Sequence, residues 1–295
     1  MNRILFNIYR VVVPKPLRTS ILKHNLKKNL LHYYSVLHPE SVDEEKLEVL
    51  EYLKSNPVSI FPYQFSMKYA PGFIEVFYDQ ERKMRYVMLD GKKLYFRRQW
   101  SDSRIRRAFA DLSREQDPLS PHRYLVNEFD VNQNDVIADI GAAEGNFSLS
   151  VTDRVKKIYL FESDNRWVDA LEATFEPYSD KTVIIRKRVS DVDDAQNVRM
   201  DTFINSRDDI TFLKIDVDGA ERQVLEGCRG ILSGRRPLKI ALCTYHKQDD
   251  AKEFSELLKG YGFNVTFSKG YMIPYYDKKL KAPWLRRGLI RAERH

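Results

Sequence analysis

From residue 136 onward, short apolar runs alternate with longer segments in which apolar residues recur every three or four positions. The runs are rich in β-branched residues and predict buried strands, whereas the periodic segments predict helices. This alternation is typical of βαβ units built on a parallel sheet. The predicted strands are residues 136–139, 157–162, 182–187, 211–216 and 238–243, and the predicted helices are residues 121–129, 145–155, 167–175, 221–227 and 251–261. We further predict that residues 263–267 and 271–276, joined by Ser-Lys-Gly, pair antiparallel and close the sheet.

The chain before residue 115 has a different pattern. Residues 43–54 carry a helical apolar stripe, with Ser41 or Asp43 as the N-terminal cap. Strict alternation then predicts three short strands, with Asp90-Gly91 as a hairpin turn. These strands are residues 73–78, 85–89 and 93–97. They would form a small antiparallel platform whose aromatic residues either make its core or stack on sugar rings.

Positive charge is concentrated at the two ends of the chain. Residues 1–39 contain seven basic residues and no acidic residue, and residues 277–295 contain seven basic residues against two acidic ones. Because the net charge is +7, the middle is acidic on balance, unlike a uniformly basic nucleic-acid-binding protein. Pro14 and Pro16 divide residues 2–36 into two predicted basic amphipathic helices. Their apolar stripe would either dock on an anionic membrane surface or pack on the protein or a second subunit.

Composition bounds the class of protein. At 295 residues and 43% hydrophobic content, the chain is long enough for one large domain with an appendage. Two cysteines, Cys228 and Cys243, do not suggest a disulfide framework and favour a reducing compartment. No run of about 18 apolar residues occurs, and residues 1–20 lack a cleavage site of small residues. We therefore expect neither a membrane span nor a secretory signal. The expected location is cytoplasmic, and peripheral contact with the inner face of the membrane stays open.

The first predicted strand ends in a carboxylate and continues into a loop of small residues. Asp139 is followed by Gly141, Ala142, Ala143 and Gly145, which let the backbone turn sharply and approach a ligand. The spacing Asp-x-Gly-x-x-x-Gly differs from the Gly-x-Gly-x-x-Gly loop that holds a pyrophosphate. An acidic residue here suits a cationic ligand, and S-adenosylmethionine carries both an ammonium and a sulfonium. The alternative is a glycine turn that only packs the next helix on the sheet.

Further polar residues follow the next two strands. Glu162 ends the second strand and could accept both hydroxyls of a ribose, a device that NAD-binding folds also use. Ser163 follows it directly. Ser190 and Asp191 come after the third strand, where they could meet an adenine amino group or simply form a solvated turn. We predict that these residues complete the cofactor site.

Three carboxylates, Asp216, Asp218 and Glu221, lie at the end of the fourth strand. Buried like charges repel one another unless they meet a cation or a proton. Asp216 could therefore hold a methyl donor, take a proton from a hydroxyl, or bind a divalent metal together with Asp218. His246 follows the fifth strand, and we predict that it is a general base beside Asp216 and Glu221. A structural role is the alternative for a lone histidine.

These residues together resemble the signatures of the FkbM family of S-adenosylmethionine-dependent methyltransferases. The similar stretches are Asp139-Ile-Gly-Ala-Ala-Glu-Gly145, Lys214-Ile-Asp-Val-Asp-Gly-Ala-Glu221 with Leu225 and Gly227, Tyr245-His-Lys with Asp249-Asp250, Pro121-His-Arg-Tyr124 and the segment 283–291. The resemblance covers about residues 115–292. Two positions depart from the family pattern: Asp218 replaces a glutamate, and Cys243 lies where many members have a glutamate.

The resemblance implies a class I methyltransferase fold. This is an α/β, Rossmann-like seven-stranded sheet with an antiparallel last strand, here with an N-terminal helical and β appendage. The expected domains are a basic amphipathic helical segment at 1–39, a small α+β appendage at 40–114 and the FkbM-like domain at 115–295. The implied activity is O-methylation with S-adenosyl-L-methionine, often of a sugar hydroxyl in a bacterial glycan or glycolipid.

Other functions stay open at this point. A protein that binds S-adenosylmethionine without turnover could serve as a scaffold for glycan enzymes. An NAD-dependent oxidoreductase would need the pyrophosphate loop that this chain lacks. A nucleic-acid methyltransferase is suggested only by the basic ends, and no Asn-Pro-Pro-Tyr-like motif for a flipped base is present, so we expect no nucleic-acid partner. Metal dependence and a homodimer are left open.

Overall fold

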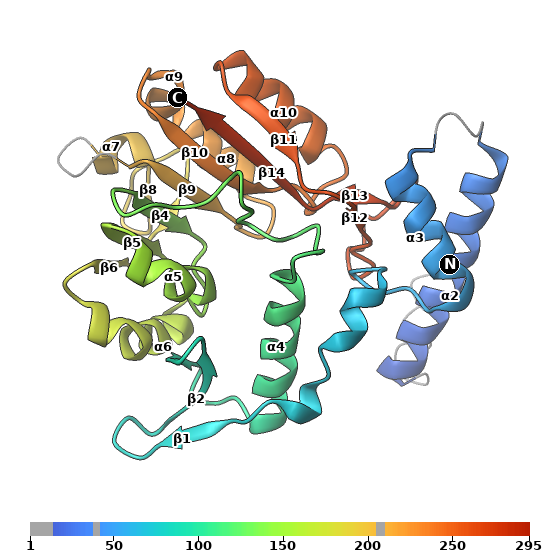
Figure 1. The fold of residues 1–295 in the computed structure, drawn as a ribbon, viewed down its shortest axis with the longest axis horizontal. Coiled ribbons are helices and arrows are strands. Elements are labelled where there is room, and N and C mark those ends of the chain that lie inside the picture. Colours follow the sequence, from blue (N-terminus) through green and yellow to red (C-terminus); the bar gives the residue numbers. More distant parts are fainter. Residues whose placement is uncertain (1–13, 38–41, 205–209) are drawn as a thin grey trace.

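The structure, a computed structural model, describes residues 14–37, 42–204 and 210–295 (Figure 1). These residues contain a seven-stranded sheet in the order β11-β14-β10-β9-β4-β5-β6. Its strands are β4 (Val136–Ile140), β5 (Lys157–Phe161), β6 (Thr182–Ile185), β9 (Phe212–Ile215), β10 (Leu238–Cys243), β11 (Asn264–Phe267) and β14 (Leu289–Arg294). The run from β10 to β6 is parallel, and β14 is antiparallel to both of its neighbours. The predicted fold class is confirmed, and the five parallel strands fall within two residues of their predicted ends.

Helices cover both faces of this sheet because its strands are apolar on both sides. Ile137 and Ala138, neighbours in β4, belong to two different core clusters. One cluster includes residues of α4, α5 and α6, and the other includes residues of α7, α8, α9 and α10. The bounds are α4 (Asp102–Glu115), α5 (Asn146–Val151), α6 (Asn165–Phe175), α7 (Met200–Ile204), α8 (Glu221–Glu226), α9 (Arg229–Ser233) and α10 (Asp250–Gly260). The predicted helix at 145–155 is shorter than expected, because its last turn, Thr152–Arg154, is a 3-10 helix.

The predicted hairpin at the end of the sheet is wrong. β11 pairs with β14, while β12 (Tyr271–Met272) pairs with β13 (Arg286–Arg287) in a separate two-stranded sheet. The charged residues within β14 interrupt its apolar run, so the apolar pattern did not predict this strand. Arg291 in this strand is nevertheless buried, because its guanidinium donates hydrogen bonds to the carbonyls of Arg123 and Tyr124.

The N-terminal helices α2 (Lys15–Val36) and α3 (Glu44–Ser55) lie at one side of the molecule, beside β12 and β13 (Figure 1). Asp43 caps α3 as predicted, accepting a hydrogen bond from the amide of Lys46 at 2.8 Å. Leu26 and Leu30 of α2 are buried in a cluster with residues of α3 and β12. This part of the apolar stripe therefore packs on the protein itself. The first of the two predicted basic helices lies mostly outside the described residues.

The small sheet consists of β1 (Phe77–Asp79), β2 (Met84–Leu89) and β3 (Lys92–Tyr95). Asp90 and Gly91 have φ of 49° and 78°, which confirms the tight hairpin. The first strand begins later than predicted, because residues 71–73 form a 3-10 turn. Tyr95 and Phe96 are buried against the main domain, so here aromatic residues serve as core.

Two local predictions around residue 115 are corrected by the structure. α4, which was not predicted, crosses from the small sheet toward the main sheet (Figure 1). The predicted helix at 121–129 is absent: the segment forms turns and one isolated bridge between Val126 and Phe129. Its apolar residues have helical spacing, but their partners are distant in sequence, as with Phe129 against Phe212. Among the described residues, none of the helices combines the length and the apolar character that a membrane crossing requires.

Candidate active site

A cavity of about 600 Å³ opens at the carboxyl ends of the parallel strands, where the strand order reverses beside β4. Ligands bind at such reversal points in open α/β sheets. Its floor is the loop after β4, and Gly141 in that loop has a φ of +80°. A Cβ on Gly141 would lie 2.0 Å from the carbonyl oxygen of Asp216, so only glycine lets the two chain segments approach this closely.

Glu162 is fixed at the wall of this cavity by two backbone amides. Its Oε2 accepts a hydrogen bond from the amide of Ala143 at 3.0 Å, and its Oε1 accepts one from Asp164 at 2.6 Å. Ala143 itself has a φ of 47°, in the left-handed region, as part of the sharp turn of this loop. The end of β5 and the loop after β4 are therefore held together by one carboxylate that also faces the cavity.

Six of the ten residues predicted to bind the cofactor line this cavity: Gly141, Ala143, Glu162, Ser163, Ser190 and Asp216. The remaining four do not line it. Ala142 is buried in the core, and Gly145 begins α5, where a Cβ would lie 2.6 Å from Phe175. Asp191 is exposed, and its carboxylate accepts a hydrogen bond from Ser190.

Asp139 has a different role from the predicted one. Its side chain is 1% exposed, 3.0 Å from the ammonium of Lys214, and it accepts a hydrogen bond from Ser148 at 2.7 Å. Lys214 also donates to the carbonyl of Gly141 at 2.7 Å. Burial alone would lower the pKa of Lys214, but the charges of Asp139 and Asp216 raise it above its ordinary value. The charge of Asp139 is thus already neutralised by Lys214 beneath the loop. This structural ion pair takes the place of the predicted direct contact between Asp139 and a cationic donor.

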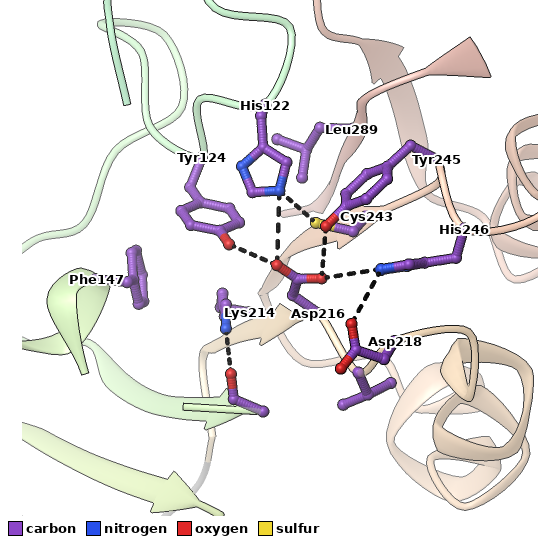
Figure 2. Close-up of polar contacts among 12 residues, drawn as sticks. His122, Tyr124, Phe147, Lys214, Asp216, Asp218, Cys243, Tyr245, His246 and Leu289 are labelled. Atoms are coloured by element: carbon purple, nitrogen blue, oxygen red, sulfur yellow. Dashed lines mark hydrogen bonds and ion pairs between the residues drawn. The ribbon is translucent and has the colours of Figure 1, made fainter. Parts of the chain in front are cut away.

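Asp216 is the centre of a cluster of polar side chains (Figure 2). Tyr124 donates a hydrogen bond to its Oδ2 at 3.0 Å, and Nε2 of His122 lies 3.5 Å from the same oxygen. The hydroxyl of Tyr245 and Nε2 of His246 lie 3.5 Å and 3.7 Å from Oδ1. Burial alone would raise the pKa of Asp216, but the contact with His122 and nearby positive charges hold it well below its ordinary value. The carboxylate is therefore ionised at neutral pH.

Sequence reasoning assigned no role to His122, Tyr124 or Tyr245. The first two lie in the stretch Pro121-His-Arg-Tyr124, which resembles the family but was predicted to be helical. Tyr245 directly precedes the predicted base. Only the tertiary structure shows that all three side chains converge on one carboxylate.

His246 lies beside the acidic cluster, where the sequence predicts it, and its nearest carboxylate is that of Glu221. Nδ1 of His246 lies 2.9 Å from Oε1 of Glu221. Glu221 is fully buried, and the same Oε1 accepts hydrogen bonds from the amides of Val217 and Gly219 at 3.2 Å. Burial alone would lower the pKa of His246, but Glu221 and Asp216 raise it above its ordinary value. Nε2 points toward Asp216 and Asp218, each 3.7 Å away (Figure 2).

A second cavity of about 770 Å³ lies on the other side of His246. Its wall includes His246, Tyr245, Gln248 and Tyr276, and the side chain of Tyr276 is 56% exposed. Asp218 lines both cavities, so they adjoin at the turn that follows β9. Two ligands bound in the two cavities would meet next to Nε2 of His246.

Two groups of side chains among the described residues offer ligand atoms within 4.8 Å of one another: Asp216 with Glu221 and His246, and His122 with Asp216 and Cys243. Asp218, the second residue of the predicted metal pair, belongs to neither group. Carboxylate and imidazole donors of the first group suit a divalent cation. A metal at Asp216 stays a prediction.

The sheet order with antiparallel β14, the close turn at Gly141 and the carboxylate at the end of β5 define a class I S-adenosylmethionine-dependent methyltransferase. The family model described as the methyltransferase FkbM domain matches residues 115–265, just over half of the chain. The chain belongs to this family.

Solved structures with a similar arrangement include methyltransferases from several organisms. The methyltransferase FkbM of Methylobacillus flagellatus is 15% identical over 56% of this chain, with a TM-score of 0.43, and this chain covers 44% of its length. SMU.1697c of Streptococcus mutans, solved in complex with S-adenosylhomocysteine, is 14% identical over 56% of this chain and 91% of its own, with a TM-score of 0.37. Trm5b of Pyrococcus abyssi is 11% identical over 72% of this chain and 56% of its own, with a TM-score of 0.42. No curated protein matches the sequence.

Substitution of Glu162 by glutamine is expected to weaken the binding of S-adenosylhomocysteine by about tenfold or more. The change removes charge-assisted hydrogen bonds to the ribose, each of which contributes about 1.5–3 kcal/mol when well formed. Isothermal titration calorimetry measures the affinity. Glu172→Gln, an exposed position on α6, is the matched control. Equal affinity of the Glu162 variant and the wild type would exclude ribose binding by this carboxylate.

Proposed function

We propose that this protein transfers a methyl group from S-adenosylmethionine to a hydroxyl of a sugar in a bacterial glycan or glycolipid. The observation that supports this function best is the arrangement of two cavities that adjoin at Asp218 beside an oriented histidine. One cavity contains Glu162, the carboxylate that would bind the ribose of the cofactor, and the other leaves room for an acceptor.

The residues that would hold the cofactor fit its parts. Glu162 would bind the ribose hydroxyls, and the loop around Gly141 and Ala143 would lie against the methionine portion. Ser190, which also lines the cavity, would lie nearest the adenine. When bound, S-adenosylmethionine supplies a methyl group whose bond to the positively charged sulfur breaks as its bond to the acceptor oxygen forms.

His246 would accept the proton of the acceptor hydroxyl at Nε2. Its Nδ1 faces the buried carboxylate of Glu221, which keeps the hydrogen on that nitrogen and leaves the lone pair of Nε2 free. Glu221 also stabilises the imidazolium that forms when the proton arrives. Asp216 and Asp218 place further negative charge beside Nε2 and support the same protonation. Positioning of the two reactants supplies most of the remaining acceleration.

The second cavity suits a sugar better than an apolar acceptor. Tyr276 exposes its ring in the cavity, and Tyr245, Gln248 and Asp249 add hydrogen-bonding groups to the wall. A sugar presents apolar C–H faces together with several hydroxyls, and such a wall can meet both. This combination is the reason for preferring a glycan acceptor to a small apolar metabolite.

The test is methyl transfer to surface glycan from cells that lack this protein. Purified protein is incubated with the glycan and isotope-labelled S-adenosylmethionine, and mass spectrometry follows the label into sugar fragments. The expected result is one labelled methyl group on a sugar oxygen. Tight S-adenosylhomocysteine binding without any labelled product would instead favour a non-catalytic scaffold.

A divalent cation is the alternative to His246 as the group that activates the hydroxyl. Asp216, Glu221 and His246 would be its ligands, and it would lower the pKa of a bound alcohol. Dialysis against EDTA distinguishes the two. Full turnover after dialysis supports the histidine, whereas loss of turnover with recovery on adding Mg²⁺ supports the metal.

A further inference from the structure

The segment 278–281, which lines part of the second cavity, is strongly basic. Lys278, Lys279 and Lys281 all line the cavity and are exposed. Within the described part of the chain, none of these three ammonium groups has an ion pair or a side-chain hydrogen bond. Three unpaired positive charges at the edge of one cavity produce a local field that attracts an anion.

Of the other charges of this cavity, those of Arg286 and Asp277 neutralise each other. Arg286 is 2% exposed, pairs with Asp277 at 2.6 Å and donates to the carbonyls of Tyr245 and His246. Lys247 donates to the carbonyl of Gly219 at 2.6 Å. Asp218 lies 3.7 Å from Nε2 of His246, and its side chain is fully exposed, so its charge can also meet a ligand.

The remaining carboxylate of the cavity wall, Asp249, is exposed at the start of α10. Asp218 and Asp249 set two negative charges against four ammonium groups, those of Lys247 and the three lysines. The net charge of the groups in this cavity that can interact with a ligand is therefore positive.

We infer that the acceptor carries a phosphate or carboxylate group, which binds at Lys278, Lys279 and Lys281 while the reactive hydroxyl lies at His246. Lysine ammonium groups act as point charges that bind phosphate and carboxylate without a fixed geometry. The acceptor class is then an anionic sugar, such as a sugar phosphate or a uronic acid. This inference rests on the proposed methyl transfer to a sugar.

Ligand-observed NMR titrations of the full chain saturated with S-adenosylhomocysteine test the inference. The probes are glucose, glucose 1-phosphate and glucuronate. We expect the two anionic sugars to bind about tenfold more tightly than glucose at low salt, with the difference shrinking as salt is added. In the variant Lys278→Gln, Lys279→Gln, Lys281→Gln the preference should disappear.

The matched control removes three exposed lysines elsewhere, as Lys156→Gln, Lys252→Gln, Lys259→Gln, and should keep the preference. Phosphatidylglycerol and phosphatidylcholine vesicles are compared in parallel. Equal binding of all three sugars overturns the inference. So does a triple-lysine variant that loses only vesicle binding, because the lysines would then serve a membrane surface.

Failure of the inference and failure of the proposed activity can be told apart. Equal binding of the three sugars to the wild-type protein, with glycan methylation intact, refutes only the acceptor class. Failure to bind S-adenosylhomocysteine refutes the proposed function itself.

Discussion

Replacement of His246 by alanine is expected to lower the rate of methyl transfer by about 10²–10⁴-fold, the usual contribution of a positioned general base. His246 lines the cavity proposed for the acceptor and not the one proposed for the cofactor, so the affinity for S-adenosylhomocysteine should stay unchanged. Single-turnover kinetics measure the rate, and calorimetry measures the affinity. An alanine variant with the wild-type rate would show that the base lies elsewhere.

The pH dependence gives a second test of the same histidine. Only neutral His246 can accept a proton, so kcat/KM should rise with pH and level off once the imidazole is deprotonated. Because Glu221 and Asp216 raise the pKa of His246, the inflection should lie above the ordinary histidine value of 6.5. Glu221→Gln removes the largest contribution to that rise and should move the inflection to lower pH.

Glu226→Gln is the control for this shift. Glu226 lies on the same helix, α8, but pairs with Arg229 at the surface. Its substitution should leave the inflection in place. An inflection that does not respond to Glu221→Gln would show that Glu221 has no electrostatic effect on the base.

Substitution of Lys214 by methionine is expected to lower the free energy of unfolding by about 3–5 kcal/mol, the usual cost of removing one partner from a buried ion pair. Asp139 is 1% exposed and Lys214 is 5% exposed, so the carboxylate would keep its charge in the interior without its partner. The carbonyl of Gly141 would also lose its donor. Urea denaturation of the purified variant measures the change.

A second substitution separates the ion pair from simple packing. Asp139→Asn in the Lys214→Met background removes the orphaned charge and should recover much of the lost stability. Lys239→Met, on the neighbouring strand β10 and half-buried, should cost less. If the double variant is no more stable than Lys214→Met alone, the ion pair is not what makes Lys214 important.

Local patterns in the sequence were sufficient for most of the secondary structure. Apolar β-branched runs predict the parallel strands because strands covered on both faces must be apolar throughout. The cap at Asp43 and the hairpin at Asp90-Gly91 depend on neighbouring backbone alone, and both are confirmed. The position of Glu162 at the end of a strand could be predicted for the same reason. A short stretch of chain is enough to show where that strand ends.

Tertiary structure decided the details of the site. Asp139 lies in the strand predicted for it, yet its charge is neutralised by Lys214, a residue on a different strand. Tyr124 and His122 reach Asp216 only because their segment, which has helical spacing, is held in turns by distant partners. Such contacts depend on side chains that are far apart in sequence and meet only after the sheet has formed.

The position of β14 has the same explanation. Its charged residues break the apolar pattern, and their burial is possible only because carbonyls from the segment before β4 accept the hydrogen bonds of Arg291. Local propensity thus determined which residues form the five parallel strands, and where the carboxylates and the histidine lie along them. Pairing across the sheet and neutralisation of buried charge, which are non-local, decided which of those side chains face a ligand.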